Sequence, residues 1–307
     1  MGLSTVGAFK NLKMDSGDYV ELEGPLLRKY QMELLQMADD IFSVCREEGI
    51  CCQLSGGSAL GAVRHGGFIP WDDDMDLNLL SRDRERFFSC FQEKFGDRYI
   101  IQTPDTPDYG LTLGRIRLKN SVSRSREDVG REECGFYIDL FFIENVPDRR
   151  LLRKLHGFFC MGFGLLLSCR MFYRNRKLMR RIVKDNPELR STFEFKIILG
   201  FLLSFLSVRT WARITDWCYG LCKNNRSEFV CIPSGRKHYF GEIYRRSDME
   251  QTLDMPFEGR QFPVAAGYDA YFNALYGPDY MTPPPESARE KHVLLELRFP
   301  DGSGPEL

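Results

Sequence analysis

The residues best suited to chemistry in this 307-residue chain are four closely spaced aspartates: Asp72, Asp73, Asp74 and Asp76. Like charges at this spacing repel one another unless water or a cation lies between them. The apolar stretch that follows predicts a strand over 75–80. Because side chains alternate along an extended chain, we expect Asp72, Asp74 and Asp76 on one side and Asp73 on the other. Three carboxylates on one edge predict a site for Mg²⁺ or Mn²⁺.

A glycine-rich turn, Gly56-Gly57-Ser58, precedes these acids. Backbone N–H groups without a neighbouring Cβ, followed by the start of a helix, favour a bound phosphate. Ser58 is expected to cap the short helical turn over 59–62. Arg64 and His65 lie between the turn and the acids, where a cation can contact a diphosphate; a histidine that only caps or packs in the loop is the alternative.

A third acid is expected from a later strand, because the combination of a glycine turn and a D-x-D sequence is typical of nucleotidyltransferases. Asp139 is the candidate, as the lone acid in the apolar stretch 136–142. Burying an unpaired carboxylate is costly, so its place needs a reason. The alternative is a structural ion pair with a buried arginine. Lys119, near Arg115 and Arg117, is expected to reach the same phosphates, unless these cations form a solvated face.

Hydrophobic periodicity predicts both helices and strands in the rest of the chain. A helix is expected over 26–48, with Gly49 as its left-handed stop. The remaining predicted helices and strands are helices over 82–95 and 266–276 and strands over 50–54, 98–102, 111–118, 136–142 and 229–232.

The region 150–228 differs in character, with two apolar stretches on either side of a basic segment. Each stretch is shorter than the roughly 20 apolar residues that a membrane span needs. Helices packed on the core are the favoured interpretation. An amphipathic hairpin on anionic lipid is the alternative.

Bulk composition narrows the class of protein. Lys and Arg (42) nearly balance Asp and Glu (43), so nothing global favours a nucleic-acid partner. The N-terminus lacks the apolar run of a secretory signal, and the myristoylation pattern fails at Val6. The ten cysteines show no zinc-finger spacing, so we expect reduced, mostly buried thiols in a cytoplasmic protein.

Four stretches together resemble the LicD family, which includes bacterial phosphocholine transferases and animal fukutin-type ribitol-phosphate transferases. The resemblance covers about residues 30–148 and 229–292, and 150–228 matches no pattern. One departure is Ala265-Ala266, where the family has a proline; another is the approach Cys134-Gly135 to the third strand. The four stretches are GGSALGAVRHGGFIPWDDDMDLNLL (56–80), FYIDLFFIENVPD (136–148), FEGRQFPV (257–264) and YFNALYGPDYMTPPPESAREKH (271–292).

The resemblance implies an α+β fold: a nucleotidyltransferase-like mixed sheet with flanking helices and a helical insert. It makes Asp74 and Asp76 metal ligands and Asp139 a third acid, either ligand or base. Asp72 matches the family's first acid and is expected to help hold a metal, whereas Asp73 is left out of the site. We expect five parts: tail 1–25, catalytic core 26–149, helical insert 150–228 with membrane apposition as the alternative, C-terminal part of the catalytic domain 229–299 and tail 300–307.

The expected activity is metal-dependent transfer of a phospho-alcohol from a CDP-alcohol to a sugar hydroxyl, with release of CMP. CDP-choline is the favoured donor, and the acceptor is a glycan or lipid-linked glycan, such as a lipopolysaccharide or teichoic-acid precursor. The protein is expected in the cytoplasm, and peripheral contact with an anionic membrane at its inner face is the alternative to a fully soluble location. Two alternatives stay open: nucleotidyl transfer from CTP or another NTP with pyrophosphate release, and a non-catalytic glycan-binding relic of the fold.

Overall fold

A computed structural model describes residues 20–125, 133–184, 189–286, 289 and 294–305. The failed myristoylation pattern at the N-terminus and the family-like His292 lie outside these residues. So does most of the expected tail 1–25.

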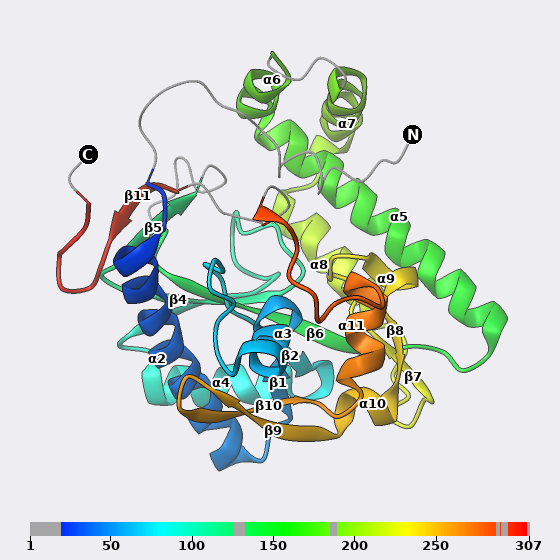
Figure 1. The fold of residues 1–307 in the computed structure, drawn as a ribbon. Helices are drawn as coiled ribbons and strands as arrows, with labels where there is room; N and C mark the ends of the chain where they lie inside the picture. Colours follow the sequence, from blue (N-terminus) through cyan, green and yellow to red (C-terminus); the bar gives the residue numbers. More distant parts are fainter. Residues whose placement is uncertain (1–19, 126–132, 185–188, 287–288, 290–293, 306–307) are drawn as a thin grey trace.

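The core of the fold is a mixed sheet, as predicted, and this sheet has seven strands (Figure 1). Its main path has the order β1-β2-β6-β4-β3, in which β2 and β6 run parallel and the other neighbours antiparallel. Apolar side chains of β2 and β6 are buried, among them Leu77, Leu79 and Leu140. The strands are β1 (Cys52–Leu54), β2 (Asp76–Leu80), β3 (Tyr99–Gln102), β4 (Gly114–Leu118), β6 (Tyr137–Asn145), β7 (Phe229–Cys231) and β8 (Ile243–Arg245).

Two small antiparallel pairs stand apart from the main sheet. One joins β5 (Val122–Ser125) to β11 (Leu294–Arg298), and the other is the hairpin of β9 (Thr252–Phe257) and β10 (Arg260–Ala265). The hairpin turns at Glu258-Gly259, both with positive φ. A two-residue turn of this kind matches the right-handed twist of the strands, which explains the glycine.

Helices cover the sheet, and the strongly periodic ones match their predictions. The first helix ends at Gly49 in the left-handed conformation, as expected. The first turn of α3 was predicted wrongly: the helix begins at Gly56, so Ser55 occupies the N-cap position and not Ser58. The helices around the sheet are α2 (Gly24–Glu48), α3 (Gly56–His65), η1 (Ser81–Asp83), α4 (Arg84–Phe95), α9 (His238–Gly241), α10 (Arg246–Glu250) and α11 (Tyr268–Tyr276).

The region after β6 is helical and projects from the sheet, with α5 crossing one edge of the molecule (Figure 1). Among the described residues, α5 is long and apolar enough to cross a membrane, and α7–η4 with α8 would reach that length only across a 95° bend. The division of the chain into five parts stays a prediction. The helices are α5 (Arg150–Arg174), α6 (Arg176–Lys184), α7 (Arg190–Leu202), η4 (Leu203–Phe205) and α8 (Val208–Tyr219).

Candidate active site

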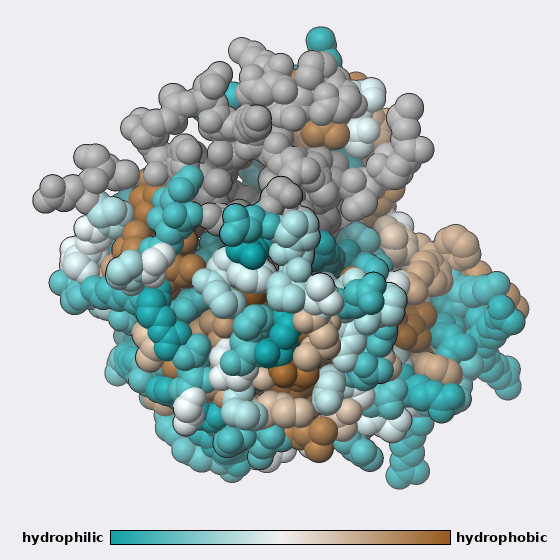
Figure 2. Space-filling model, in the orientation of Figure 1, coloured by the Kyte–Doolittle hydropathy of each residue, from teal (hydrophilic) through white to brown (hydrophobic). Residues whose placement is uncertain are grey.

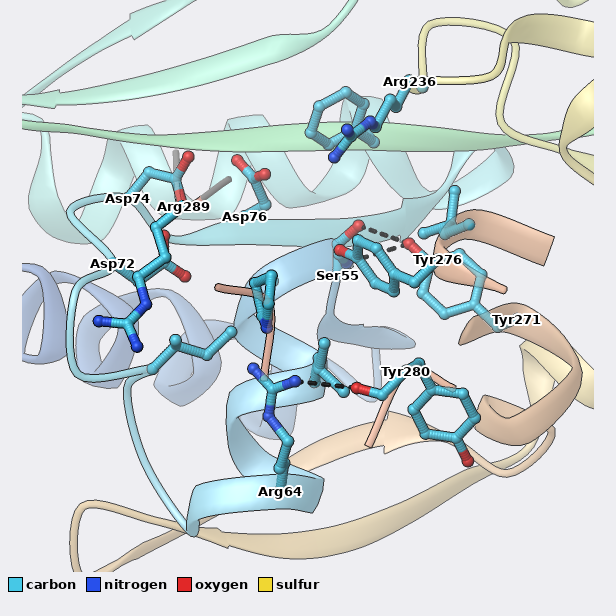
Figure 3. Close-up of a pocket in the computed structure, with 18 of the residues that line it drawn as sticks. Ser55, Arg64, Asp72, Asp74, Asp76, Arg236, Tyr271, Tyr276, Tyr280 and Arg289 are labelled. Carbon is cyan, nitrogen blue, oxygen red and sulfur yellow. Dashed lines mark hydrogen bonds between the residues drawn. The ribbon is translucent and has the colours of Figure 1, made fainter. Parts of the chain in front are cut away.

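A cavity of about 440 Å³ opens where α3, the start of β2 and α11 meet (Figure 3). Its walls come from segments far apart in the sequence: the glycine turn, the acidic loop, residues 232–242, residues 271–284 and Arg289. The sheet fixes the acidic wall, because Asp76 is the first residue of the central strand β2. The fold therefore brings the predicted glycine turn and the predicted acids to one place.

Asp72, Asp74 and Asp76 line this cavity, whereas Asp73 does not and is 8% exposed. The alternation expected from the sequence therefore holds at these four positions, although only Asp76 belongs to a regular strand. Figure 3 shows the three carboxylates along one side of the cavity, across from Tyr271 and Tyr276.

The two glycines leave space between the turn and the acids. A Cβ on Gly57 would lie 3.0 Å from Oδ2 of Asp72, and one on Gly56 would lie 3.8 Å from Oδ2 of Asp76. Gly56 also has a positive φ of 49°. Its N–H donates to the hydroxyl of Tyr271 at 3.0 Å, which ties the turn to α11. We call the space between this turn and the carboxylates of Asp72 and Asp76 the cradle. Any side chain at residue 57 would occupy it and exclude a ligand of the carboxylates.

The acids repel one another in this wall. Burial, followed by the charges of Asp74 and Asp73, raises the pKa of the Asp72 carboxyl well above its usual range. A bound cation would reduce the repulsion among these carboxylates. Among the described residues, no three His, Cys, Asp or Glu side chains are arranged to hold a metal by themselves. Mg²⁺ needs only one or two protein carboxylates when substrate phosphates complete its octahedron, so the acids fit this ion.

Arginines supply positive charge at the same cavity. Arg64, predicted from the sequence, lines it and donates to the carbonyl of Tyr280 at 2.8 Å. Arg236 and Arg289 also line it, and neither was predicted. The guanidinium of Arg289 lies 4.0 Å from the ring centroid of Trp71, and its Nε is buried without a hydrogen-bond partner in the described part of the chain. Such a group suits an anionic ligand.

Three of the predicted phosphate-binding residues lie outside the cavity lining. Ser58 is buried, and its hydroxyl accepts the N–H of Asp76 at 3.0 Å, which fixes the start of β2. His65 is exposed and accepts a long hydrogen bond from Arg64 at 3.4 Å. Lys119 donates to the carbonyl of Gly96 at 2.7 Å, since β4 ends one residue before it. None of these three side chains therefore lines the cavity that the acids face.

Asp139 lies beside Asp76, because the two are register partners on the parallel strands β2 and β6. Its carboxylate is held by Arg115, with Nε 2.6 Å from Oδ1 and Nη2 2.8 Å from Oδ2. Burial acts to lower the pKa of Arg115, but Asp139 and two tyrosines hold it well above its usual value. This is the ion pair that the sequence left open as the alternative. A role of Asp139 as ligand or base stays a prediction.

Comparison with known proteins finds similar sequences. Residues 49–146 match the family described as LicD/FKTN/FKRP, nucleotidyltransferase domain. This part of the chain is therefore similar to that family's nucleotidyltransferase domain. It is 27% identical over 286 residues to the lipopolysaccharide cholinephosphotransferase LicD of Haemophilus influenzae, covering 88% of this chain and 97% of that protein. It is 44% identical over 50 residues to the human ribitol 5-phosphate transferase FKRP, covering 16% of this chain and 10% of that protein.

The cavity has a second wall outside the matched LicD domain, made of aromatic rings and a buried carboxylate. Tyr271, Tyr276 and Tyr280 come from α11 and the segment after it. Glu242 is 2% exposed, and its burial raises the pKa of the carboxyl to about 7. The tyrosines fall within a stretch that resembles the family, but their role was not predicted. Nothing in the sequence around Glu242 marks it as a cavity residue.

Proposed function

We propose that this protein transfers a phospho-alcohol, with phosphocholine favoured, from a CDP-alcohol to a sugar hydroxyl and releases CMP. The observation that carries the proposal is the cavity in which Asp72, Asp74 and Asp76 face the Gly56-Gly57 turn. The family domain and the activity named for the Haemophilus relative support it. A glycan or lipid-linked glycan precursor in the cytoplasm is the proposed acceptor.

Asp74 and Asp76, assisted by Asp72, are the residues that would hold Mg²⁺ or Mn²⁺. The ion, when bound, neutralises charge on the donor diphosphate and on the leaving CMP. The protein's own contribution is position and charge. The first turn of α3 presents its positive end, and Arg64 and Arg289 lie where they can contact the diphosphate.

Asp139 is proposed to act beside Asp76 as the third acid. Arg115 holds its carboxylate in place with two hydrogen bonds. A carboxylate paired on both oxygens must exchange part of that contact before it can bind an ion or accept the proton of the acceptor hydroxyl.

The aromatic wall favours choline as the alcohol. A quaternary ammonium is attracted to the faces of aromatic rings, and Tyr271 and Tyr276 of this wall line the cavity. Glu242 adds a buried carboxylate at the same wall. Ribitol and glycerol are neutral and would gain nothing from this negative wall.

Product analysis tests the proposal. The purified chain is incubated with Mg²⁺ and, separately, CDP-choline, CDP-ribitol, CDP-glycerol or CTP, with and without a glycan acceptor. CMP from CDP-choline is expected, with a loss of at least about a thousandfold in Asp74→Asn and Asp76→Asn. Asp73→Asn is the matched control, because Asp73 does not line the cavity.

Other products would redirect the assignment. Pyrophosphate from CTP would replace the proposal by nucleotidyl transfer. CMP from another donor would keep the reaction and change the alcohol. Absence of turnover together with absence of donor binding in calorimetry would indicate a glycan-binding relic.

A further inference from the structure

The helix α5 carries an apolar stripe along one side. The helix α7 covers only part of the length of this stripe. At its C-terminal half, α7 packs against the stripe: a Cβ on Gly200 would meet the carbonyl of Cys169, and Tyr173 contacts Phe201 at 5.5 Å between ring centroids. Toward the N-terminus of α5 the same helical stripe is exposed. Its members are Leu151, Leu152, Leu155, Phe158 and Phe159, which are 46–69% exposed.

A second exposed row continues on α7 and η4. It consists of Phe195, Ile198, Phe201, Leu202 and Phe205, which are 50–73% exposed. The two rows together are called the apolar face here. Figure 2 shows part of it as brown atoms along α5. Contiguous exposed apolar surface of this kind marks contact with a partner or a membrane.

The charges around the apolar face indicate which kind of partner binds it. From Arg149 to Lys184 the sequence contains no Asp or Glu, although the whole chain has a net charge of −1. Arg149, Arg150 and Lys154 are exposed at the beginning of α5, next to the apolar stripe. On α6, Lys177 and Arg181 are exposed as well. Apolar side chains flanked by cations suit a bilayer that contains anionic lipids.

The opposite side of α5 is covered by the protein itself. There, His156 contacts the carbonyl of Cys218 at 2.8 Å and packs edge-on against Tyr239. Cys160 is buried in the same cluster. Lipid cannot surround a helix that the protein itself covers on one side, so these contacts favour a position of α5 in the membrane interface.

From these observations we infer that the apolar face docks the protein peripherally on an anionic bilayer, with α5 in the plane of the interface. This inference is independent of the proposed reaction.

Flotation of the full chain with vesicles tests the inference without any substrate. Vesicles of phosphatidylcholine are compared with vesicles that also contain phosphatidylglycerol, at low and high salt. We expect flotation with the anionic vesicles, weakened by salt. Phe158→Ser/Phe159→Ser should reduce binding at least about tenfold. Arg150→Gln/Lys154→Gln should reduce binding to the anionic vesicles about tenfold or more.

The matched control is Met32→Ser/Leu253→Ser, which removes exposed apolar side chains elsewhere and should bind as the unchanged chain. Circular dichroism melts establish that each variant is folded. Flotation that Phe158→Ser/Phe159→Ser leaves unchanged would overturn the inference. So would absence of flotation, or a dimer in solution that this variant converts to a monomer, which would assign the face to a second copy.

Discussion

At the scale of single residues, Gly57 offers the sharpest test of the cavity. An added methyl group there would lie 3.0 Å from Oδ2 of Asp72, inside the space between turn and acids. We expect Gly57→Ala to weaken Mn²⁺-dependent donor binding about tenfold or more, while the helix itself gains slightly in stability. Calorimetric titration of the donor in the presence of Mn²⁺ measures this.

The control is Gly162→Ala, at a helical position where a Cβ meets nothing within 4 Å. It should bind the donor as the unchanged chain does. Equal donor affinity in Gly57→Ala would show that the ligand does not enter the cradle.

The raised pKa of the Glu242 carboxyl should make donor binding depend on pH. Its pKa of about 7 means that the carboxyl is about half protonated in the empty cavity at neutral pH. A quaternary ammonium favours the ionised form, so affinity for CDP-choline should rise several-fold between pH 6 and pH 8 and level off above. Titrations across this range measure the slope.

Glu242→Gln should bind CDP-choline more weakly and with a flat pH profile. CDP-ribitol is the matched ligand, because its alcohol is neutral and should show little slope with either protein. A slope that persists in Glu242→Gln would place the titrating group elsewhere.

At the scale of elements, Arg115 and Asp139 join β4 to β6 as register partners. Their side chains are only 9% and 13% exposed. Removing one partner leaves a buried charge alone, so Arg115→Met should lower the free energy of unfolding by about 3–5 kcal/mol. The double variant Arg115→Met/Asp139→Leu should recover most of this loss, as urea unfolding would show.

The same double variant distinguishes a role of Asp139 in the reaction from a purely structural role in the sheet. If the acid takes part in transfer, the protein should be folded and lack CMP release. If the pair only stabilises the sheet, the folded double variant should retain activity.

The sequence predicted the helices and strands that depend on the pattern of neighbouring residues. The helices α2 and α4 and the strands β2 and β6 follow from periodicity, and alternation correctly separated Asp73 from its neighbours. The partner of Asp139 depends on the register of β4 against β6, which no local pattern contains. Lys119 does not reach the cavity, because the strand β4 ends at Leu118 and Asn120 adopts a positive φ.

At the scale of the whole molecule, Glu144 links stability to pH. It lies near the far end of β6 from Asp139, is 3% exposed and accepts a hydrogen bond from Ser81 at 2.7 Å. Burial raises the pKa of its carboxyl to about 7. Because the folded-state pKa is the higher one, its contribution is fully present below about pH 4.5 and is lost as pH rises through 7.

Glu144→Gln should therefore be close to neutral at pH 5 and stabilising at pH 8, by up to about 3 kcal/mol. Urea unfolding at both pH values measures the difference. Glu47→Gln is the control, since this side chain is exposed. Equal effects of Glu144→Gln at both pH values would contradict the buried-acid explanation.

The bond between Tyr271 and the N–H of Gly56 spans 215 residues of sequence. During synthesis, the glycine turn therefore leaves the ribosome long before the helix that anchors it exists. Nascent chains and prematurely terminated products that lack α11 would carry the acids but not the finished cavity. Activity should thus switch on late in synthesis, and incomplete copies would not consume donor.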